Sequence, residues 1–486
     1  MTNSSVKGNT AENKTTTMLK TELAGNRDNL FQIFLVACVA TIGGFLFGFD
    51  SGVINGTVDG LKFAFHSDSI GTGFNVASML LGCAIGAFGA GLSADSFGRK
   101  SVLLVSAVLF IVSAWGSGIA TSSMEFVVYR LIGGLAVGGA SVLAPAYISE
   151  IAPVRFRGML SSIQQMAIIA GLFCSFLSNY LLVEVSGNSI EPLWLGFETW
   201  RWMFWIELLP ALLFFACLLL IPESPRYLAI TNQQIKGMNV LGRLFGKNKA
   251  SAIWQDIRTS IDNNSAIKIT DVFNPNSSKL KAVIWIGIGL AVLQQLAGVN
   301  VVFYYGAVLW QAVGFSESDA LLINIISGAI SIVACFIALM LIDKIGRKPL
   351  LLIGSVGMTF SLFGIATAFA NGTIGADGQL DLGSWSFTAL LQVHLYVFFF
   401  NFSWGPIMWV MLGEMFPNKI RGSGLAIAGL AQWLANFFIT MTFPLLLTSI
   451  GLATTFSFYT LFAFSSILFV LWFVVETKGK KLEQMT

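Results

Sequence analysis

The sequence has few charged residues for its length and little of the chemistry that enzymes use. Charged residues make up 11% of the 486 residues, and there are two histidines. The five cysteines lie inside apolar stretches, without disulfide or metal-ligand spacing, so we interpret them as packing residues. The sequence contains no nucleophile motif, metal-ligand cluster or phosphate-binding loop. These absences disfavour an enzyme and predict no cofactor, and the net charge of +3 predicts no nucleic-acid partner.

Apolar residues are abundant instead. They make up 55% of the chain, with a mean hydropathy of +0.76, which indicates an all-α polytopic membrane protein. Residues 1–28 are polar and lack the pattern of a cleaved signal peptide, so the first span is expected to be retained. Twelve runs reach the roughly 20 residues that cross a bilayer. They are expected at 30–56, 72–94, 101–121, 124–148, 159–184, 200–221, 281–311, 320–343, 349–371, 386–413, 422–447 and 452–475.

Positive charges are distributed unevenly between the two sides of this twelve-span layout. Of the 28 Lys and Arg residues, only Lys62, Arg130 and Arg201 lie outside the two tails and the loops that follow even-numbered spans. The positive-inside rule therefore predicts that both termini are cytoplasmic. We expect a multi-pass protein of the cell membrane that functions as a monomer in the lipid bilayer.

An internal repeat divides the chain into two halves. DSFGRK (95–100), after the second span, recurs as DKIGRK (343–348) after the eighth, and EIAPVRFRG (150–158) recurs as EMFPNKIRG (414–422). Two six-helix halves of the same orientation follow, with a ligand site expected between them near mid-membrane. The predicted segments are a tail (1–28), a first bundle (29–222), a linker (223–280) with short amphipathic helices near 235–245 and 253–257, a second bundle (281–475) and a tail (476–486).

The repeated motifs carry acidic and basic residues at matching positions in both halves. They either form ion pairs that hold the cytoplasmic face closed and break when it opens, or simply follow the positive-inside rule. The duplication with the same spacing favours the gate. Its candidate residues are Asp95, Arg99, Glu150, Arg157, Asp343, Arg347, Glu414 and Arg421.

The seventh span carries polar residues at membrane depth. Gln294, Gln295 and Asn300 lie in its middle, with Gly298 between them to bend the helix and Tyr304 following. Polar side chains at this depth need partners, so they face a cavity, another helix or a ligand. They either join helices to one another or form a site for a neutral, hydroxylated ligand. The number of amides favours the binding site.

Three ionisable residues fall inside spans of the first half. Asp50 lies six residues before the expected end of the first span, and Arg130 and Glu207 lie about 10 Å into the fourth and sixth spans, at 1.5 Å of rise per residue. They can form one cluster at a similar depth. A buried Asp that alternately meets Arg and loses it binds and releases a proton, and a static salt bridge is the competing interpretation.

Two further spans carry features that bear on the site. Gln164 and Gln165 are adjacent in the fifth span, so one of them is expected to point inward. Pro406 lies within the tenth span and predicts a hinge there.

Several motifs occur in order along nearly the whole chain, from about residue 30 to 483. They are GRK after spans two and eight, PESPR (222–226), LQQLAGVNVVFYYG (293–306), SWGPIMWV (403–410), EMFPNKIRG (414–422) and ETKGKKLE (476–483). Together they resemble the sugar porter family of the major facilitator superfamily, and within it the bacterial sugar/proton symporters.

The resemblance implies alternating access by two rocking six-helix halves, without covalent chemistry. It implies that Asp50 takes the coupling proton, with Arg130 and Glu207 as its partners. Leu172 is apolar where pentose symporters of the family carry a second glutamine, which favours a hexose. The implied sugar contacts are Phe47, Gln165, Gln294, Gln295, Asn300, Tyr304, Trp409, Gln432 and Trp433.

The function predicted from the sequence is a proton-coupled monosaccharide symporter, for a hexose such as glucose or a pentose such as xylose. A proton-independent facilitator is the first alternative, but facilitators of this family commonly carry an amide at the position of Asp50. A transporter-like sugar sensor is less favoured, because little sequence follows Lys481.

Overall fold

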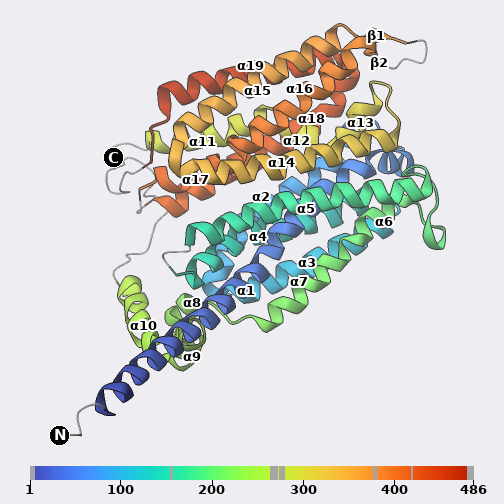
Figure 1. Ribbon diagram of the computed structural model, residues 1–486. Helices are drawn as coiled ribbons and strands as arrows, with labels where there is room; N and C mark the ends of the chain where they lie inside the picture. Colours follow the sequence, from blue (N-terminus) through green and yellow to red (C-terminus); the bar gives the residue numbers. More distant parts are fainter. Residues whose placement is uncertain are drawn as a thin grey trace.

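Twelve helical spans form the body of the protein. The computed structural model describes residues 6–153, 157–262, 272, 280–375, 380–417 and 420–478. Within these ranges, twelve helical stretches are long and apolar enough to cross a membrane, which confirms the predicted number. The helices form two groups that lie side by side, α1–α7 and α11–α19 (Figure 1). Large side chains such as Phe360 and Leu220 remain exposed on the outside of the bundle, as expected where lipid replaces water.

Apart from α1, which is longer at both ends, the helices lie close to the predicted spans. The first half comprises α1 (Val6–Phe65), α2 (Ser69–Phe97), α3 (Arg99–Ile119), α4 (Ser123–Ile151), α5 (Arg157–Ser186), α6 (Thr199–Ile206) and α7 (Leu208–Leu220), with a short 3-10 turn at Trp194–Gly196. The second half comprises α11 (Ala282–Leu296), α12 (Val299–Tyr304), α13 (Gly306–Gln311), α14 (Glu317–Ile345), α15 (Arg347–Ala370), α16 (Ser386–Phe402), α17 (Trp404–Met415), α18 (Arg421–Ser449) and α19 (Gly451–Phe473). Strands β1 (Thr373–Ile374) and β2 (Leu380–Asp381) pair antiparallel, and a 3-10 turn follows at Gly383–Trp385.

The linker forms three short helices, α8 (Pro225–Ile230), α9 (Gln234–Phe245) and α10 (Lys247–Asp262). The amphipathic pattern predicted the positions of α9 and α10, but α8 was not predicted. Their apolar faces share a small core around Leu241 and Trp254. They lie at the end of the molecule from which the amino-terminal part of α1 projects, and the β1–β2 pair lies at the opposite end (Figure 1). We call these the linker end and the far end.

Proline interrupts two of the spans. Pro210 has no N–H to donate to the carbonyl of Ile206, and the sixth span is divided there into α6 and α7 at Glu207. Pro406 removes the same bond from Phe402, and α16 and α17 meet at Ser403, whose backbone is non-helical (φ −133°, ψ −86°). The hinge predicted from Pro406 coincides with this break.

The first span extends further than the sequence predicted. Its end was expected near residue 56, but α1 continues past Asp59 and Lys62 to Phe65. Asp59 is tolerated inside the helix because it accepts a hydrogen bond from Gln311 of the second half (2.7 Å). Asp50 therefore lies well inside the span, and its estimated position six residues from the end was wrong.

Candidate functional site

The seventh span is broken where its amides lie. It ends its first helical segment at Leu296, and Gly298 adopts a left-handed backbone (φ 82°) before α12 begins. A side chain at Gly298 would be strained in this conformation and would also press on the ring of Tyr459, 2.7 Å away. The break turns Asn300 back toward Gln295, which a continuous helix would not do.

The amides predicted to bind a ligand form one connected chain. Asn300 Nδ2 donates to Gln295 Oε1 (2.6 Å), and Gln295 Nε2 donates to Gln294 Oε1 (3.0 Å). Gln432 Nε2 on α18 donates to the same Gln294 oxygen (3.1 Å), and Gln294 Nε2 donates to the carbonyl of Trp404 (2.8 Å). The structure thus brings four predicted site residues together, of which the three glutamines are buried and Asn300 is partly exposed.

Aromatic rings meet beside this amide chain. Phe47 on α1 and Trp433 on α18 lie 5.7 Å apart between ring centroids, so the site spans the boundary between the halves. Tyr304 is buried beside Ser51 and Asn436, again from opposite halves. Trp409 remains 38% exposed, so its ring is available for a further contact.

The two adjacent glutamines of the fifth span differ in environment. Gln164 is buried against α1, where Gly44 leaves room for its amide, and neither of its amide atoms has a hydrogen-bond partner among the residues that the structure describes. Gln165 is partly exposed. Leu172 is buried, and its side chain packs against Gly52 of α1.

The predicted charge cluster is built around one ion pair. The Arg130 guanidinium on α4 pairs with the Asp50 carboxylate on α1, and both side chains are 1% exposed. Arg130 Nη2 also donates to the Asp50 carbonyl (3.3 Å) and to Met79 Sδ (2.8 Å). Asp50 Oδ2 and Arg130 Nε are buried and have no hydrogen-bond partner in the described part of the chain, so each group has a bonding position that is not used in this arrangement.

Glu207 lies in the same buried region at the break between α6 and α7. It is 1% exposed and close enough to interact electrostatically with both Asp50 and Arg130. Among the described residues, Glu207 forms no ion pair with Arg130. The three residues therefore share one region, as expected, but among the described residues only Asp50 and Arg130 of this cluster form an ion pair.

A second set of charges lies at the linker end of the first half. Arg99 pairs with Asp95 (2.9 Å) and with Glu150 (3.2 Å), which also accepts a hydrogen bond from Ser224. Gly98, with φ 91°, makes the sharp turn that brings Arg99 to the start of α3.

The second half repeats this arrangement. Arg347 pairs with Asp343 (3.0 Å) and with Glu414 (2.8 Å), which accepts a hydrogen bond from Thr477 (2.6 Å). Each of these ion pairs lies within one half. Arg421 donates to the carbonyl of Phe416 (3.4 Å), and the side chain of Arg157 lies outside the described part of the structure.

Two glutamates that were not predicted from the sequence complete these clusters. Glu223 accepts the backbone N–H of Lys100 (3.1 Å), and Glu476 accepts the backbone N–H of Lys348 (2.9 Å). Each carboxylate therefore lies at the amino terminus of a helix, α3 or α15, where it satisfies donors that have no partner in the helix. The signal was present as PES (222–224) and VET (475–477), which follow the last span of each half.

Glu476→Gln is expected to destabilise the protein at neutral pH. Partial burial acts to raise the pKa of Glu476, but the backbone N–H groups of Lys478, Arg347 and Lys348 outweigh it and lower the pKa below its usual value. The ionised form is therefore stabilising above the usual carboxyl pKa, and this contribution is lost as the pH falls through the lowered value. We expect a loss of about 0.5 kcal/mol, reduced by solvent screening, in thermal melts at pH 7.

The difference between Glu476→Gln and the wild type should shrink when the melts are repeated at acidic pH. Asp343→Asn is the control, because the Asp343 side chain is 82% exposed and its charge is well solvated. If the difference in thermal stability between Glu476→Gln and the wild type stayed constant across the pH range, it would contradict a stabilising role for the ionised Glu476 carboxylate.

Hydrogen bonds between the two halves gather at the far end. They join α1, α2, α5 and the loop after α5 to the second half. The pairs are Asn55 with Phe303, Ala307 and Asn324, Asp59 with Gln311, Ser69 with Thr448, Glu184 with Ser318, and Ser189 with Glu317. The halves are thus fastened together at the far end, and the amide chain lies between that end and the linker end.

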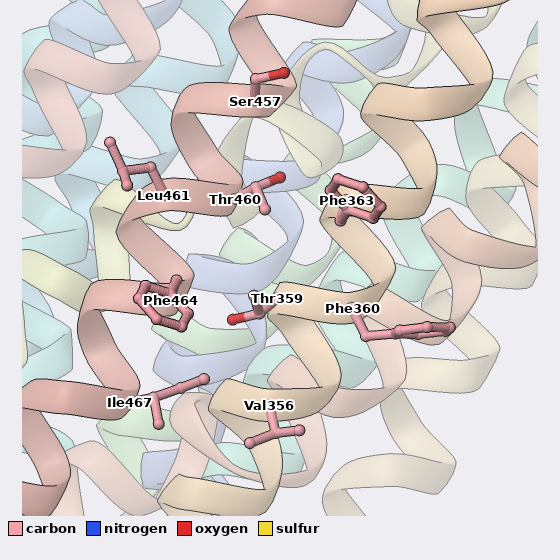
Figure 2. Close-up of a pocket in the computed structure, with 9 residues that line it drawn as sticks. All are labelled: Val356, Thr359, Phe360, Phe363, Ser457, Thr460, Leu461, Phe464 and Ile467. Carbon is pink, nitrogen blue, oxygen red and sulfur yellow. The ribbon is translucent and has the colours of Figure 1, made fainter.

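A groove on the outer surface of the second half differs in character from the polar site around the amide chain. It has a volume of about 610 Å³ and lies between α15 and α19, lined by residues such as Phe360, Phe363 and Phe464 (Figure 2). The hydroxyls of Thr359 and Thr460 are satisfied by carbonyls of their own helices. This groove offers an apolar surface to lipid and does not resemble a site for a hydroxylated ligand.

Two parallel six-helix halves, fastened at one end and sharing a buried neutral site, define a membrane transporter of the major facilitator class. Residues 36–486 match the family model described as "Sugar (and other) transporter". The chain belongs to this sugar transporter family, as its motifs predicted, and it is a multi-pass protein of the plasma membrane.

Curated relatives and solved structures agree with this assignment. The chain is 47% identical to the glucose transport protein of Synechocystis sp. over 94% of this chain and 97% of that protein. It is 39% identical to the D-xylose-proton symporter of Escherichia coli K12 over 94% and 96% of the two chains. The xylose transporter XylE of Escherichia coli, in an inward open conformation, has a TM-score of 0.79 at 38% identity, covering 93% of this chain and 99% of that chain.

Proposed function

We propose that this protein imports a monosaccharide together with a proton by alternating access. The connected amides on α11, α12 and α18, which lie beside the Phe47–Trp433 contact between the halves, carry the proposal. Neutral donors and acceptors match the hydroxyls of a sugar without requiring a charged ligand. The names of the relatives support a sugar, since one is a glucose transport protein and another a D-xylose-proton symporter.

The binding residues have distinct roles in this proposal. Gln294, Gln295, Asn300 and Gln432 exchange part of their mutual hydrogen bonds for bonds to sugar hydroxyls. Trp409 and Trp433 offer ring faces to the C–H face of the sugar, and Phe47 closes over it. Tyr304 and Gln165 complete the site from α12 and α5. Leu172 is buried against α1, so it does not itself support the preference for a hexose. That preference rests instead on the higher sequence identity to the glucose transport protein.

Asp50, Arg130 and Glu207 perform the proton coupling. Asp50 is ionised when Arg130 pairs with it and takes a proton when Arg130 moves away, with Glu207 as the alternative partner for the guanidinium. The buried Asp50–Arg130 pair and its unused bonding positions support this exchange. A proton driven by the membrane potential supplies about 2.3 kcal/mol per 100 mV, and a pH gradient adds about 1.4 kcal/mol per unit.

We further propose that the linker end faces the cytoplasm, because the positive charges gather there. The far end is then the outer end. The charge clusters around Arg99 and Arg347 hold the cytoplasmic ends of each half together as rigid units, and their rearrangement accompanies opening at that side. We propose that the transporter works as a monomer.

The purified protein in lipid vesicles is expected to accumulate labelled glucose more than tenfold when an inward proton gradient is imposed. A protonophore should abolish the accumulation, and competition by unlabelled xylose would measure the preference between hexose and pentose. Uptake that only equilibrates, with or without the gradient, would contradict symport and identify a facilitator. Absence of both binding and uptake would contradict sugar transport.

A further inference from the structure

Asn55 on α1 makes a network of hydrogen bonds across the boundary between the halves. It is 1% exposed. Its Nδ2 donates to the carbonyl of Phe303 (2.7 Å), and its Oδ1 accepts the backbone N–H of Ala307 (3.2 Å). Both partners belong to the seventh span in the other half. An asparagine side chain is therefore bonded to the backbone of a helix that must move relative to it when the halves rock.

The two backbone groups are four residues apart, which is the spacing of a helical hydrogen bond. In this span the helix is broken between α12 and α13 at Tyr305, whose ψ is 16°. The carboxamide of Asn55 bonds to the acceptor and the donor that would otherwise bond each other. Within the described part of the span these two backbone groups form no bond to each other, and the carboxamide takes the place of that helical bond and satisfies both groups.

Neighbouring residues are shaped to admit this side chain. Gly306 lies at the break, and a Cβ there would come within 3.0 Å of Asn55 Nδ2. Asn324 on α14 donates its Nδ2 to Asn55 Oδ1 (2.8 Å), so the carboxamide is bonded from two helices of the second half. The same Cβ would come within 2.2 Å of Asn324 Oδ1, so any larger residue at position 306 would displace Asn324 and disturb its hydrogen bond to Asn55.

The other break in the seventh span is fixed in a different way. Tyr396 on α16 donates its hydroxyl to the carbonyl of Ala297 (2.7 Å), just before Gly298. At the break that Asn55 holds, Tyr305 itself donates to the carbonyl of Thr440 on α18 (3.0 Å). The partners of Tyr396 and Tyr305 belong to the same half as the span, so these anchors travel with it. Asn55 ties the break at Tyr305 to the opposite half.

We propose that Asn55 is a positioning residue of the outer gate that acts by exchanging a hydrogen bond with the backbone of the seventh span. When the outer end is closed, Asn55 occupies the gap and keeps α12 and α13 bent toward α1. When the outer end opens, Asn55 withdraws, and the N–H of Ala307 bonds to the carbonyl of Phe303 directly, which straightens the span. The exchange leaves no backbone group unsatisfied in either state, so the gate can move without the penalty of a buried unpaired group.

The arrangement also links the two sites of the proposed symport, on which this inference rests. Asp50 lies five residues before Asn55 on the same helix, and Asn300 and Tyr304 lie on α12, which Asn55 holds. A change at the proton site that shifts α1 is therefore transmitted to the helix that carries sugar contacts.

The test measures the outer gate directly, without transport. Spin labels are attached at Leu195 and Ile374, exposed far-end positions in opposite halves, in a chain whose five native cysteines are replaced. In Asn55→Ala the ratio of outer-open to outer-closed distances is expected to rise by about tenfold or more, because three hydrogen bonds across the gate are lost. Asn324→Ala, which removes one of them, should shift the ratio in the same direction by less.

Asn179→Ala is the matched control. Asn179 is also fully buried and also bonds the backbone of α1, at Val53 (3.0 Å), but both partners lie in the first half. A general loosening of the fold would affect both variants. An unchanged distance distribution in Asn55→Ala, or an equal shift in Asn179→Ala, would overturn the proposal.

Hydrogen exchange of the segment 303–309 tests the exchange of partners. In Asn55→Ala the amide of Ala307 should exchange as slowly as in the wild type, because Phe303 takes over as its acceptor. Exchange faster by ~10-fold or more, the ratio that 1.4 kcal/mol produces, would show that the helical bond does not re-form and would overturn the proposal. If the protein transported no sugar, the proposed function would be refuted. The spin-label distances and the hydrogen exchange would still test the role of Asn55.

Discussion

Asp50→Asn is expected to reduce the accumulation of sugar in energised vesicles from more than tenfold to about onefold. The substitution keeps the shape and an acceptor oxygen of the side chain but removes the group that takes up a proton. Without proton movement, the roughly 2.3 kcal/mol per 100 mV and 1.4 kcal/mol per pH unit no longer drive uptake. Exchange of labelled for unlabelled sugar across the membrane needs no net proton movement, so it should continue.

The loss of charge also leaves Arg130 buried without its ion-pair partner, which costs about 3–5 kcal/mol in other proteins when the guanidinium has nowhere to go. Here Glu207 lies close enough to receive it. The measurements are therefore accumulation and exchange on the same preparation, with a thermal melt to check folding. Asp68→Asn serves as the control, because Asp68 caps α2 through a hydrogen bond from Gly71 that an asparagine can also accept. Accumulation that survives in Asp50→Asn would show that the coupling proton binds elsewhere.

Gln294→Ala should weaken sugar binding by about 10- to 100-fold. Gln294 is the centre of the amide chain, since it accepts from Gln295 and Gln432 and donates to the carbonyl of Trp404. Its loss removes a predicted sugar contact and also leaves its neighbours without the partner that orients them. One or two lost hydrogen bonds of 1–1.5 kcal/mol each, together with the unpaired groups, account for this range.

Direct binding of labelled glucose to the detergent-purified protein measures the effect. Gln392→Ala is a suitable control, because it makes the same change on α16, where Gln392 packs against Gly364 of α15 and lies outside the amide chain. Equal losses of affinity in the two variants would mean that the effect comes from the fold of the second half. Full affinity in Gln294→Ala would remove the amide chain from the sugar site.

Much of the fold could be read from the order of apolar and polar residues. Each span is long and apolar, so its existence depends on local composition and on the requirement that backbone groups in lipid bond internally. The end of the first span was not predicted, because a charged residue such as Asp59 is typical of a loop. Inside the helix it is stabilised by the hydrogen bond from Gln311 of the other half. Local polarity cannot reveal a partner that lies 252 residues away.

The candidate site likewise combines residues that the sequence predicted with contacts that only the packing determined. Gln294, Gln295 and Asn300 were recognisable because amides at membrane depth are unusual, and the sequence predicted that they belong to one site. Which of them bond each other depended on the break at Gly298, which turns Asn300 back toward Gln295. The choice of Arg130 between two acidic neighbours was also open from spacing alone, and the packing of α1 against α4 placed it on Asp50.

By itself the sequence determined the membrane class, the number of spans, the internal repeat, the family and the short list of polar residues at depth, because each of these follows from which residue types stand where along one chain. Only the tertiary structure decided how those residues are partnered: the chain of amides, the Asp50–Arg130 contact, the glutamates at the starts of α3 and α15, and Asn55 in the gap of the seventh span. The physical reason is that a buried polar group is stabilised by whichever partner the packing brings within about 3 Å, and that distance is set by helices far apart in sequence.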